Sequence, residues 1–143
     1  IPFEDAELLA VTVAMLADSA QVAGGKLYVL GGAFDTINAR AFPALVRSVS
    51  VVLVAEIAPA ERNRDLAIAI RLLDEDGAAL GVESKGLMRV GEPSSLPAGA
   101  STLVPLVASF LGVRFPKTGG YVFVVQHEGS ELGRISFRVR EAR

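Results

Sequence analysis

The amino-acid sequence predicts an all-β protein, built as a two-sheet antiparallel β-sandwich of about seven to nine strands. Short valine-rich runs recur along the chain, and glycine and acidic residues bound them as turn signals. Hydrophobic residues make up 51% of the 143 residues and charged residues 21%, so the chain can bury a core. No Pro-, Gly- or Ser-rich linker divides it, which indicates one domain over residues 1–143. A closed β-barrel is the alternative architecture.

The first predicted hairpin joins residues 8–22 to residues 26–30. Leucine, alanine and methionine in the first run would also suit a helix, but larger side chains alternate with small ones, which favours a strand. A glycine pair suits the turn between the two strands. Gly31 and Gly32 stand inside the second strand, where they indicate a bulge or a close approach of another part of the chain.

The middle of the chain predicts three further strands. Residues 45–57 form a long apolar run, and the polar loop 60–65 leads from it into residues 66–73. The turn 74–77 ends in Asp-Gly between apolar runs, which is the strongest short hairpin signal in the sequence. Residues 79–90 form the return strand.

The last third predicts another three strands. Residues 102–115 form a long run in which Pro105 lacks a backbone donor, which favours an edge position or the start of a strand. The clearest hairpin comes last, with strands at 121–127 and 132–140 and a turn at 128–131.

The opening hairpin carries a resemblance to a known family. Residues 16–22 followed by 25–32 resemble an uncharacterised bacterial family, known only as a domain of unknown function. Pro43, the turn 74–77, the run 120–123 and Phe137 fit the same pattern. The closing hairpin also occurs in many immunoglobulin-like and C2-like sandwiches. The resemblance implies a bacterial β-sandwich protein without an assigned activity, and it supplies no catalytic residues.

Composition excludes several classes of function. The formal net charge of -2 gives no global electrostatic reason to bind nucleic acid, so no nucleic-acid partner is expected. The chain has no cysteine, which excludes disulfides, zinc–thiolate sites and cysteine nucleophiles. His127 is the single histidine, so multi-histidine metal sites are excluded too. We therefore expect a protein without cofactor or metal that is not an enzyme.

The sequence does not predict an integral membrane segment. Residues 93–113 form the longest uncharged stretch, but prolines, glycines, serines and threonines interrupt it. Glu4, Asp5 and Glu7 precede the first apolar run, where a secretory signal would need positive charge. We expect a soluble, cytoplasmic protein. Because the chain begins at Ile1, removal of a leader is the open alternative.

Two charged groups are candidate ligand sites. Asp74, Glu75 and Asp76 would hold calcium through their oxygen atoms, although an acidic hairpin turn is the favoured interpretation. Three arginines share one face of the last predicted strand and would meet phosphate groups or an acidic partner. A charged edge strand that discourages aggregation is favoured over that role. The arginines are Arg134, Arg138 and Arg140, and Arg143 extends them.

Two single residues invite specific roles. His127, near Glu128 and Glu131, would be a general base oriented by a carboxylate, but an exposed histidine at a strand end is the favoured interpretation. Tyr121 is similar to the tyrosine corner of sandwich domains, so its hydroxyl is expected to bond a backbone group.

The most informative feature is the apolar character of both faces of several predicted strands. We expect the inward positions to be Val11, Val13, Met15, Val49, Val51, Leu53, Leu66, Ile68, Ile70, Tyr121, Phe123 and Val125. The opposite set comprises fifteen residues, including Leu16, of which ten are apolar and only Arg71 is charged. A soluble monomer rarely exposes so large an apolar face, so something is expected to cover it. The predicted contact residues are Ala10, Ala14, Val52, Val54, Ala67, Ala69, Val122 and Val124.

The leading hypothesis is a non-enzymatic module that self-associates into a homo-oligomer or filament through this uncharged face. Internal cover by the chain's own loops or a short helix, from residues 93–113, would produce the same pattern. The alternative function is a sandwich that binds a ligand or a membrane surface. It would use calcium at the acidic turn 74–76 or phosphate groups at the arginine stripe.

Overall fold

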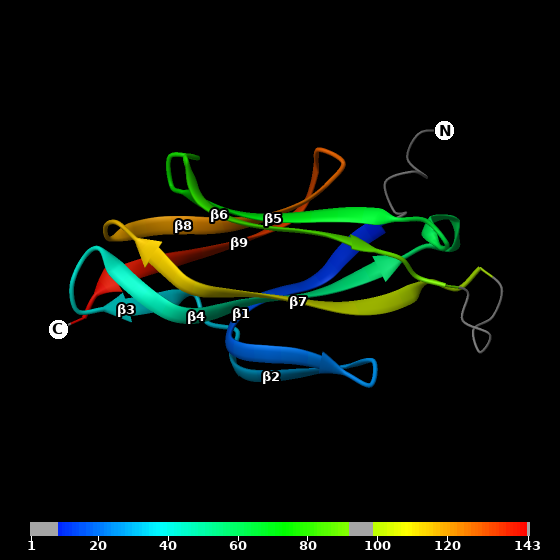
Figure 1. Ribbon diagram of the computed structural model, residues 1–143, viewed down its shortest axis with the longest axis horizontal. Helices are drawn as coiled ribbons and strands as arrows, with labels where there is room; N and C mark the ends of the chain where they lie inside the picture. Colours follow the sequence, from blue (N-terminus) through cyan, green and yellow to red (C-terminus); the bar gives the residue numbers. More distant parts are fainter. Residues whose placement is uncertain (1–8, 92–98, 143) are drawn as a thin grey trace.

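The computed structural model describes residues 9–91 and 99–142, which form nine strands and one short 3-10 turn (Figure 1). Glu4, Asp5, Glu7, residues 93–98 and Arg143 lie outside the described residues. The elements are β1 (Leu9–Ala23), β2 (Lys26–Gly32), β3 (Thr36–Ala39), β4 (Ala44–Ile57), η2 (Pro59–Glu61), β5 (Leu66–Asp74), β6 (Ala79–Met88), β7 (Thr102–Phe115), β8 (Gly119–His127) and β9 (Ser130–Glu141).

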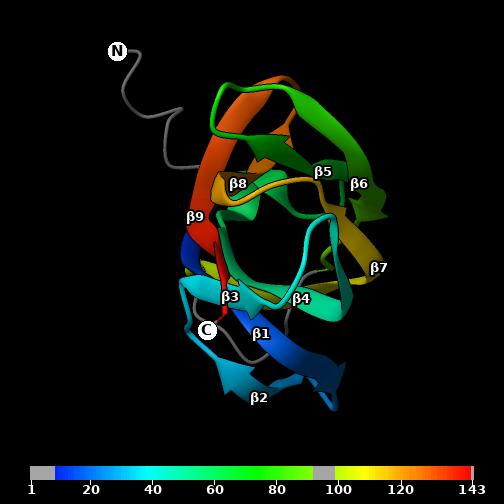
Figure 2. The ribbon, with the colours of Figure 1, turned by 90° about the vertical axis from the view of Figure 1, so that its left-hand side faces the viewer.

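The strands form two layers (Figure 2). Sheet 1 has four strands in the order β2-β1-β4-β7, and sheet 2 has five in the order β3-β9-β8-β5-β6. All pairs are antiparallel except β3 with β9, which is parallel. The predicted all-β sandwich is therefore confirmed, and the closed barrel is rejected. Strand β3 was not predicted, because four residues are too few to display an alternating pattern.

The core lies between the sheets and is rich in aromatic rings. Phe123 and Phe137 stack with their ring centroids 5.6 Å apart, and Phe115 meets the edge of Tyr121 at 4.9 Å. Such pairs contribute beyond the burial of their area. Tyr121 also donates a hydrogen bond from its hydroxyl to the Lys117 carbonyl at 2.6 Å, which confirms the expected backbone partner.

The predicted inward phase is confirmed for β4, β5 and β8, and in β1 it is right for Val11 but wrong for Val13 and Met15. Val49, Val51 and Leu53 are at most 1% exposed, as predicted. In β1, however, Leu16 is fully buried in the core, whereas Val13 is 39% exposed. A register shift between Val11 and Val13 explains the difference. One extra residue at a bulge turns every later side chain to the opposite face.

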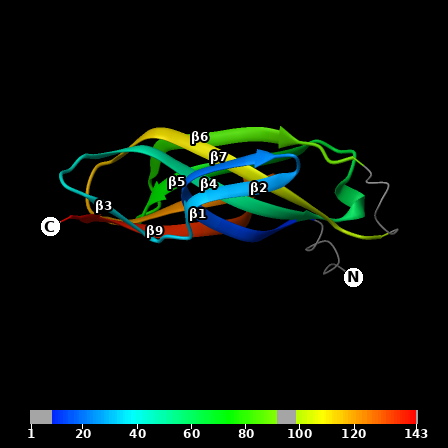
Figure 3. The ribbon, with the colours of Figure 1, turned by 90° about the horizontal axis from the view of Figure 1, so that it is seen from below.

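The β1–β2 hairpin folds back across the outer face of sheet 1 (Figure 3). Ala17 is the last residue of β1 to pair with β4 and the first to pair with β2. On β4, Ser50 and Val52 point away from the core, yet they are 1% and 0% exposed. The chain thus supplies its own cover for the centre of this face. Figure 3 shows the β1–β2 hairpin lying across this face, whereas residues 102–113 belong to β7 of the same sheet.

The predicted close approach at Gly31 is found within this hairpin. Gly31 has φ +62°, and a Cβ atom there would collide with the carboxylate of Asp18. At Gly32, a Cβ atom would lie 2.8 Å from Cγ1 of Val29 and 3.1 Å from the sulfur of Met15. The glycine pair therefore lets β2 lie tightly against the bend in β1.

Candidate interaction surface

The two sheets end in four edge strands, which differ in how they are protected. Natural proteins shorten or charge an edge strand, because its unpaired backbone groups otherwise attract another strand. Strand β3 has four residues, and β6 carries Glu83 and Lys85. Strand β7 has fourteen residues and only one charged side chain, Arg114. Among the described residues, nothing pairs with the second side of β7.

One hydrogen bond fixes which backbone groups of β7 face outward. The Thr12 hydroxyl, on β1, donates to the Val54 carbonyl at 3.2 Å, so the backbone groups of Val54 face β1. Val54 pairs with Pro105. Because these groups alternate along a strand, those of Val107, Ser109 and Leu111 face the free edge together with Pro105. Pro105 therefore lacks its N–H on the free side of β7, where β4 requires no donor, and this position confirms the predicted edge.

The outward side chains of β7 are largely apolar and exposed to solvent. Leu103 is 64% exposed and Leu111 is 78% exposed. Ser109 lies between them and shares a hydrogen bond of 3.1 Å with Ser50 of β4. An edge strand that carries exposed leucines is the arrangement that edge protection normally avoids.

An apolar groove runs beside this edge, between β6 and β7. It has a volume of about 140 Å³, and Leu53, Ile68 and Ile70 form part of its lining. Leu87 of β6 borders the groove and is 73% exposed. Strands β6 and β7 lie along the same flank of the sandwich (Figure 2). We call the free edge of β7 together with this groove the open flank.

The eight predicted contact residues do not form one surface. Ala10, Ala14, Val52 and Val54 belong to sheet 1, whereas Ala67, Ala69, Val122 and Val124 belong to sheet 2. Two of them are buried within the single chain, since Val52 is 0% and Val124 is 4% exposed. The open flank was missed because a face pattern does not reveal which strand lies at an edge.

The outer face of sheet 2 is not uncharged. Arg71 lies 3.5 Å from Glu83, and Lys85 lies at the same distance from Glu83. Those partners come from β6, which pairs with β5. The sequence pattern considered only β5 and β8 for this face, and the neighbouring strands supply its charges.

The acidic turn 74–76 is a structural turn. Oδ1 of Asp74 accepts hydrogen bonds from the backbone N–H groups of Asp76 and Ala78, both at 2.9 Å. This confirms the favoured interpretation as a hairpin turn. Over residues 9–91 and 99–142, no cluster of three or more histidine, aspartate or glutamate side chains is arranged to hold a metal ion.

The arginine stripe is partly neutralised. Arg134 and Glu131 share two hydrogen bonds, at 2.6 and 3.0 Å. This bonding lowers the pKa of Glu131 and raises the pKa of Arg134. Arg138 and Arg140 have no acidic side chain within ion-pair distance in the described part of the chain. They project from β9 as single exposed charges.

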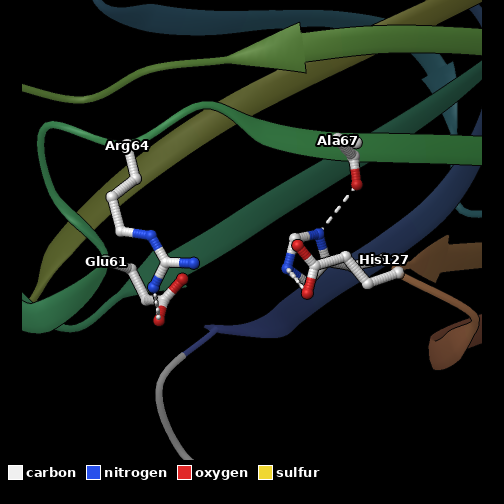
Figure 4. Close-up of polar contacts among 5 residues, drawn as sticks. Glu61, Arg64, Ala67 and His127 are labelled. Atoms are coloured by element: carbon white, nitrogen blue, oxygen red, sulfur yellow. Dashed lines mark hydrogen bonds and ion pairs between the residues drawn. The ribbon is translucent and has the colours of Figure 1, made fainter.

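His127 is more buried than predicted, and its ring contacts the Ala67 backbone (Figure 4). Its side chain is 13% exposed, and Nδ1 lies 2.8 Å from the Ala67 carbonyl oxygen. Because a carbonyl only accepts, Nδ1 carries the hydrogen. Nε2 lies 3.7 Å from a carboxylate oxygen of Glu128. The ring therefore joins the end of β8 to the start of β5, and the favoured interpretation as an exposed histidine is wrong.

The polar loop 60–65 hides two charged residues that sequence analysis missed. Glu61 and Arg62 are 5% and 7% exposed. Glu61 pairs with Arg64 at 3.2 Å (Figure 4), and Arg62 donates to the Thr102 hydroxyl at 2.9 Å. Arg62 also donates to the Ala100 carbonyl. These bonds hold the start of β7 against η2.

The fold is a two-sheet β-sandwich in which the long edge strand β7 carries no charge before Arg114. The chain belongs to a family of unknown function, DUF6941, whose sequence profile matches residues 12–140. The expected membership of an uncharacterised domain family is thus confirmed. No curated protein matches the sequence significantly.

A similar solved structure is the alkylpurine DNA glycosylase AlkC of Pseudomonas fluorescens, bound to DNA containing an abasic site analogue. The sequence identity is 16%, and the TM-score is 0.46. The match covers 93% of this chain and 30% of that chain. At this level of likeness, nothing about activity passes from the glycosylase to this protein. Among the residues described in this chain, no helix is long and apolar enough to cross a membrane.

Proposed function

We propose that this protein is a non-enzymatic interaction module that self-associates into a homo-oligomer through the open flank. The observation that carries the proposal is strand β7, a fourteen-residue edge with one charged side chain. Addition of a strand to an edge is a common mode of protein recognition, because main-chain hydrogen bonds supply affinity and side chains supply specificity. We assign the module to the cytoplasm, in keeping with the sequence analysis.

The free energies of leucine burial and of association favour an assembly of modest affinity. Leu87, Leu103 and Leu111 are each more than 60% exposed. Burying a leucine side chain contributes about 1.5–3 kcal/mol, whereas association itself costs about 4–15 kcal/mol. Leucines contributed by both copies, with hydrogen bonds along β7, can exceed that cost. The net free energy of association is then small, so we expect the assembly to depend on protein concentration.

The absence of an enzymatic role belongs to the same proposal. His127 is the one histidine of the chain, and its Nδ1 is engaged by the Ala67 carbonyl. The chain also lacks cysteine. The chain therefore offers few side chains suited to acid–base or nucleophilic catalysis.

The test is light scattering after size exclusion, over a concentration series from micromolar to about 100 μM, the range in which modest affinities appear. Two leucines provide matched variants: Leu111 on β7 is 78% exposed, and Leu30 on β2 is 73% exposed. We expect wild type and Leu30→Lys to associate, and Leu111→Lys to remain a monomer. A wild type that stays monomeric throughout would overturn the proposal, as would equal loss of association in both variants.

A further inference from the structure

We infer that two copies pair through β7 in an antiparallel arrangement, with a two-fold axis at Ser109. This inference rests on the proposed function and names the geometry of its contact. It would join sheet 1 of one copy to sheet 1 of the second copy in one continuous sheet.

The backbone of β7 offers one uninterrupted window for pairing. Val107, Ser109 and Leu111 direct their N–H and carbonyl groups to the free edge. Before this window, Pro105 has no N–H to donate. After it, Gly112 adopts φ +65°, which breaks the extended conformation. The window therefore runs from Val107 to Leu111, and its central residue is Ser109.

An antiparallel pairing about a two-fold axis places each residue of this window opposite a residue of the same window. Ser109 meets Ser109 of the second copy, and Val107 meets Leu111 of the second copy. In each of these pairs, both residues exchange their hydrogen bonds. An axis near Pro105 would leave carbonyl groups without a donor, because Pro105 has no N–H. A parallel pairing is slightly less stable per residue than an antiparallel one.

The charges of the window favour a second copy as the occupant. A two-fold contact is self-complementary, so a charged residue at its centre would meet the same charge across the axis. Residues 102–113 contain no charged side chain, and Arg114 lies beyond the window. Two identical copies of this edge therefore approach without repulsion.

The side chains of the window fit the same register. Leu111, at 78% exposure, would pack against the half-buried Val107 of the second copy on the outer face. Ser109 is small, so two of these residues can face each other across the axis. On the inner face, Ala108 would lie opposite Phe110 of the second copy, beside the groove that Ala108 helps to line. Each exposed leucine at this end of β7 thereby gains a partner.

Single cysteines test the register directly, because the natural chain has none. In a hydrogen-bonded antiparallel pair the Cα atoms lie about 5.5 Å apart, which is within reach of a disulfide. We expect Ser109→Cys to form a covalent dimer rapidly under mild oxidation. Leu103→Cys should not, because the register separates the two copies of residue 103 by tens of Å, at about 3.3 Å per residue. Leu30→Cys should not either, because β2 lies at the opposite edge of sheet 1 from β7.

A second pair of variants guards against loss of the Ser50 bond in Ser109→Cys. Val107→Cys and Leu111→Cys should each cross-link poorly alone and form a mixed dimer at least about tenfold faster when combined, as expected for sites held within disulfide distance. Light scattering is measured on the same samples. Association in solution with cross-links only at Leu103→Cys, or equally at all positions, overturns the register but leaves the proposed function intact. A monomer in solution overturns both.

Discussion

Strands β6 and β7 are the edge strands of the two sheets on the same flank of the molecule, but only β6 is protected by charged side chains. Strand β6 has ten residues, and its Glu83 pairs with both Lys85 and Arg71. Strand β7 has fourteen residues, no charge before Arg114 and two leucines that are more than 60% exposed. This contrast between a protected edge and an open edge is the basis for proposing β7 as a contact surface.

The same contrast extends to the outer faces of the two sheets. Sheet 2 covers its outer face with ion pairs such as Arg71–Glu83 and Arg134–Glu131. Sheet 1 buries the centre of its outer face beneath the β1–β2 hairpin, so that Val52 is fully buried. Sheet 2 therefore carries charges on its outer face, whereas the β1–β2 hairpin of the chain itself covers the centre of the outer face of sheet 1.

The largest expected effect comes from placing a charge on each outer face. Val52→Asp should destabilise the fold by about 3–5 kcal/mol, because it leaves a buried charge without a partner. Val122→Asp, at a half-buried site in sheet 2 near Arg134, should cost about 1 kcal/mol or less. Urea unfolding of both variants measures the difference. Equal losses would show that the hairpin does not cover β4.

The next effect concerns the fit of the hairpin. Gly31→Ala should destabilise the protein by about 1–3 kcal/mol, because the residue adopts a positive φ and the new Cβ meets Asp18. Gly86→Ala on β6 is the control, since a Cβ atom there meets nothing within 4 Å. Thermal unfolding of the pair provides the comparison. If Gly86→Ala and Gly31→Ala lost equal stability, the close fit of the hairpin at Gly31 would be contradicted.

A third change makes β6 resemble β7. The double variant Glu83→Val with Lys85→Val removes the charges that protect the β6 edge. We expect assemblies larger than those of wild type, because both edges of the flank then invite pairing. Light scattering at matched concentration measures the change. An unchanged assembly size would show that these charges do not protect the edge.

The smallest expected effect is a pH dependence on β9. The pKa of Glu131 is lowered by its hydrogen bonds to Arg134, so the folded state favours the charged carboxylate. The resulting stability is present above the ordinary carboxyl pKa and is lost as pH falls through the lowered one. The effect is small because both side chains are exposed. Melting temperatures between pH 7 and pH 3 should fall slightly less in Glu131→Gln than in wild type, and an identical fall in both would contradict this assignment.

Local pattern predicted the strands well and their environment less well. Valine-rich runs and the Asp-Gly turn predicted β4, β5 and β6, because those signals lie within a few residues. The phase of β1 after Val11 was wrong, because one extra residue near Thr12 reverses the face of Met15 and Leu16. No pattern within β1 reveals that its second half leaves β4 to pair with β2.

The candidate surface was predicted only in outline. Apolar residues on both faces indicated that something must cover the sheets, and Pro105 indicated an edge. The cover of Val52 comes from the chain itself, and the charges beside Ala69 come from β6. Both depend on which strands become neighbours, and that is a property of topology.

The most direct test follows hydrogen exchange at the backbone amides of Val107, Ser109 and Leu111, which face the free edge of β7. Exchange at these amides should slow as protein concentration rises, while exchange at the β6 edge should stay unchanged. Fast exchange of all three at every concentration would contradict pairing through β7.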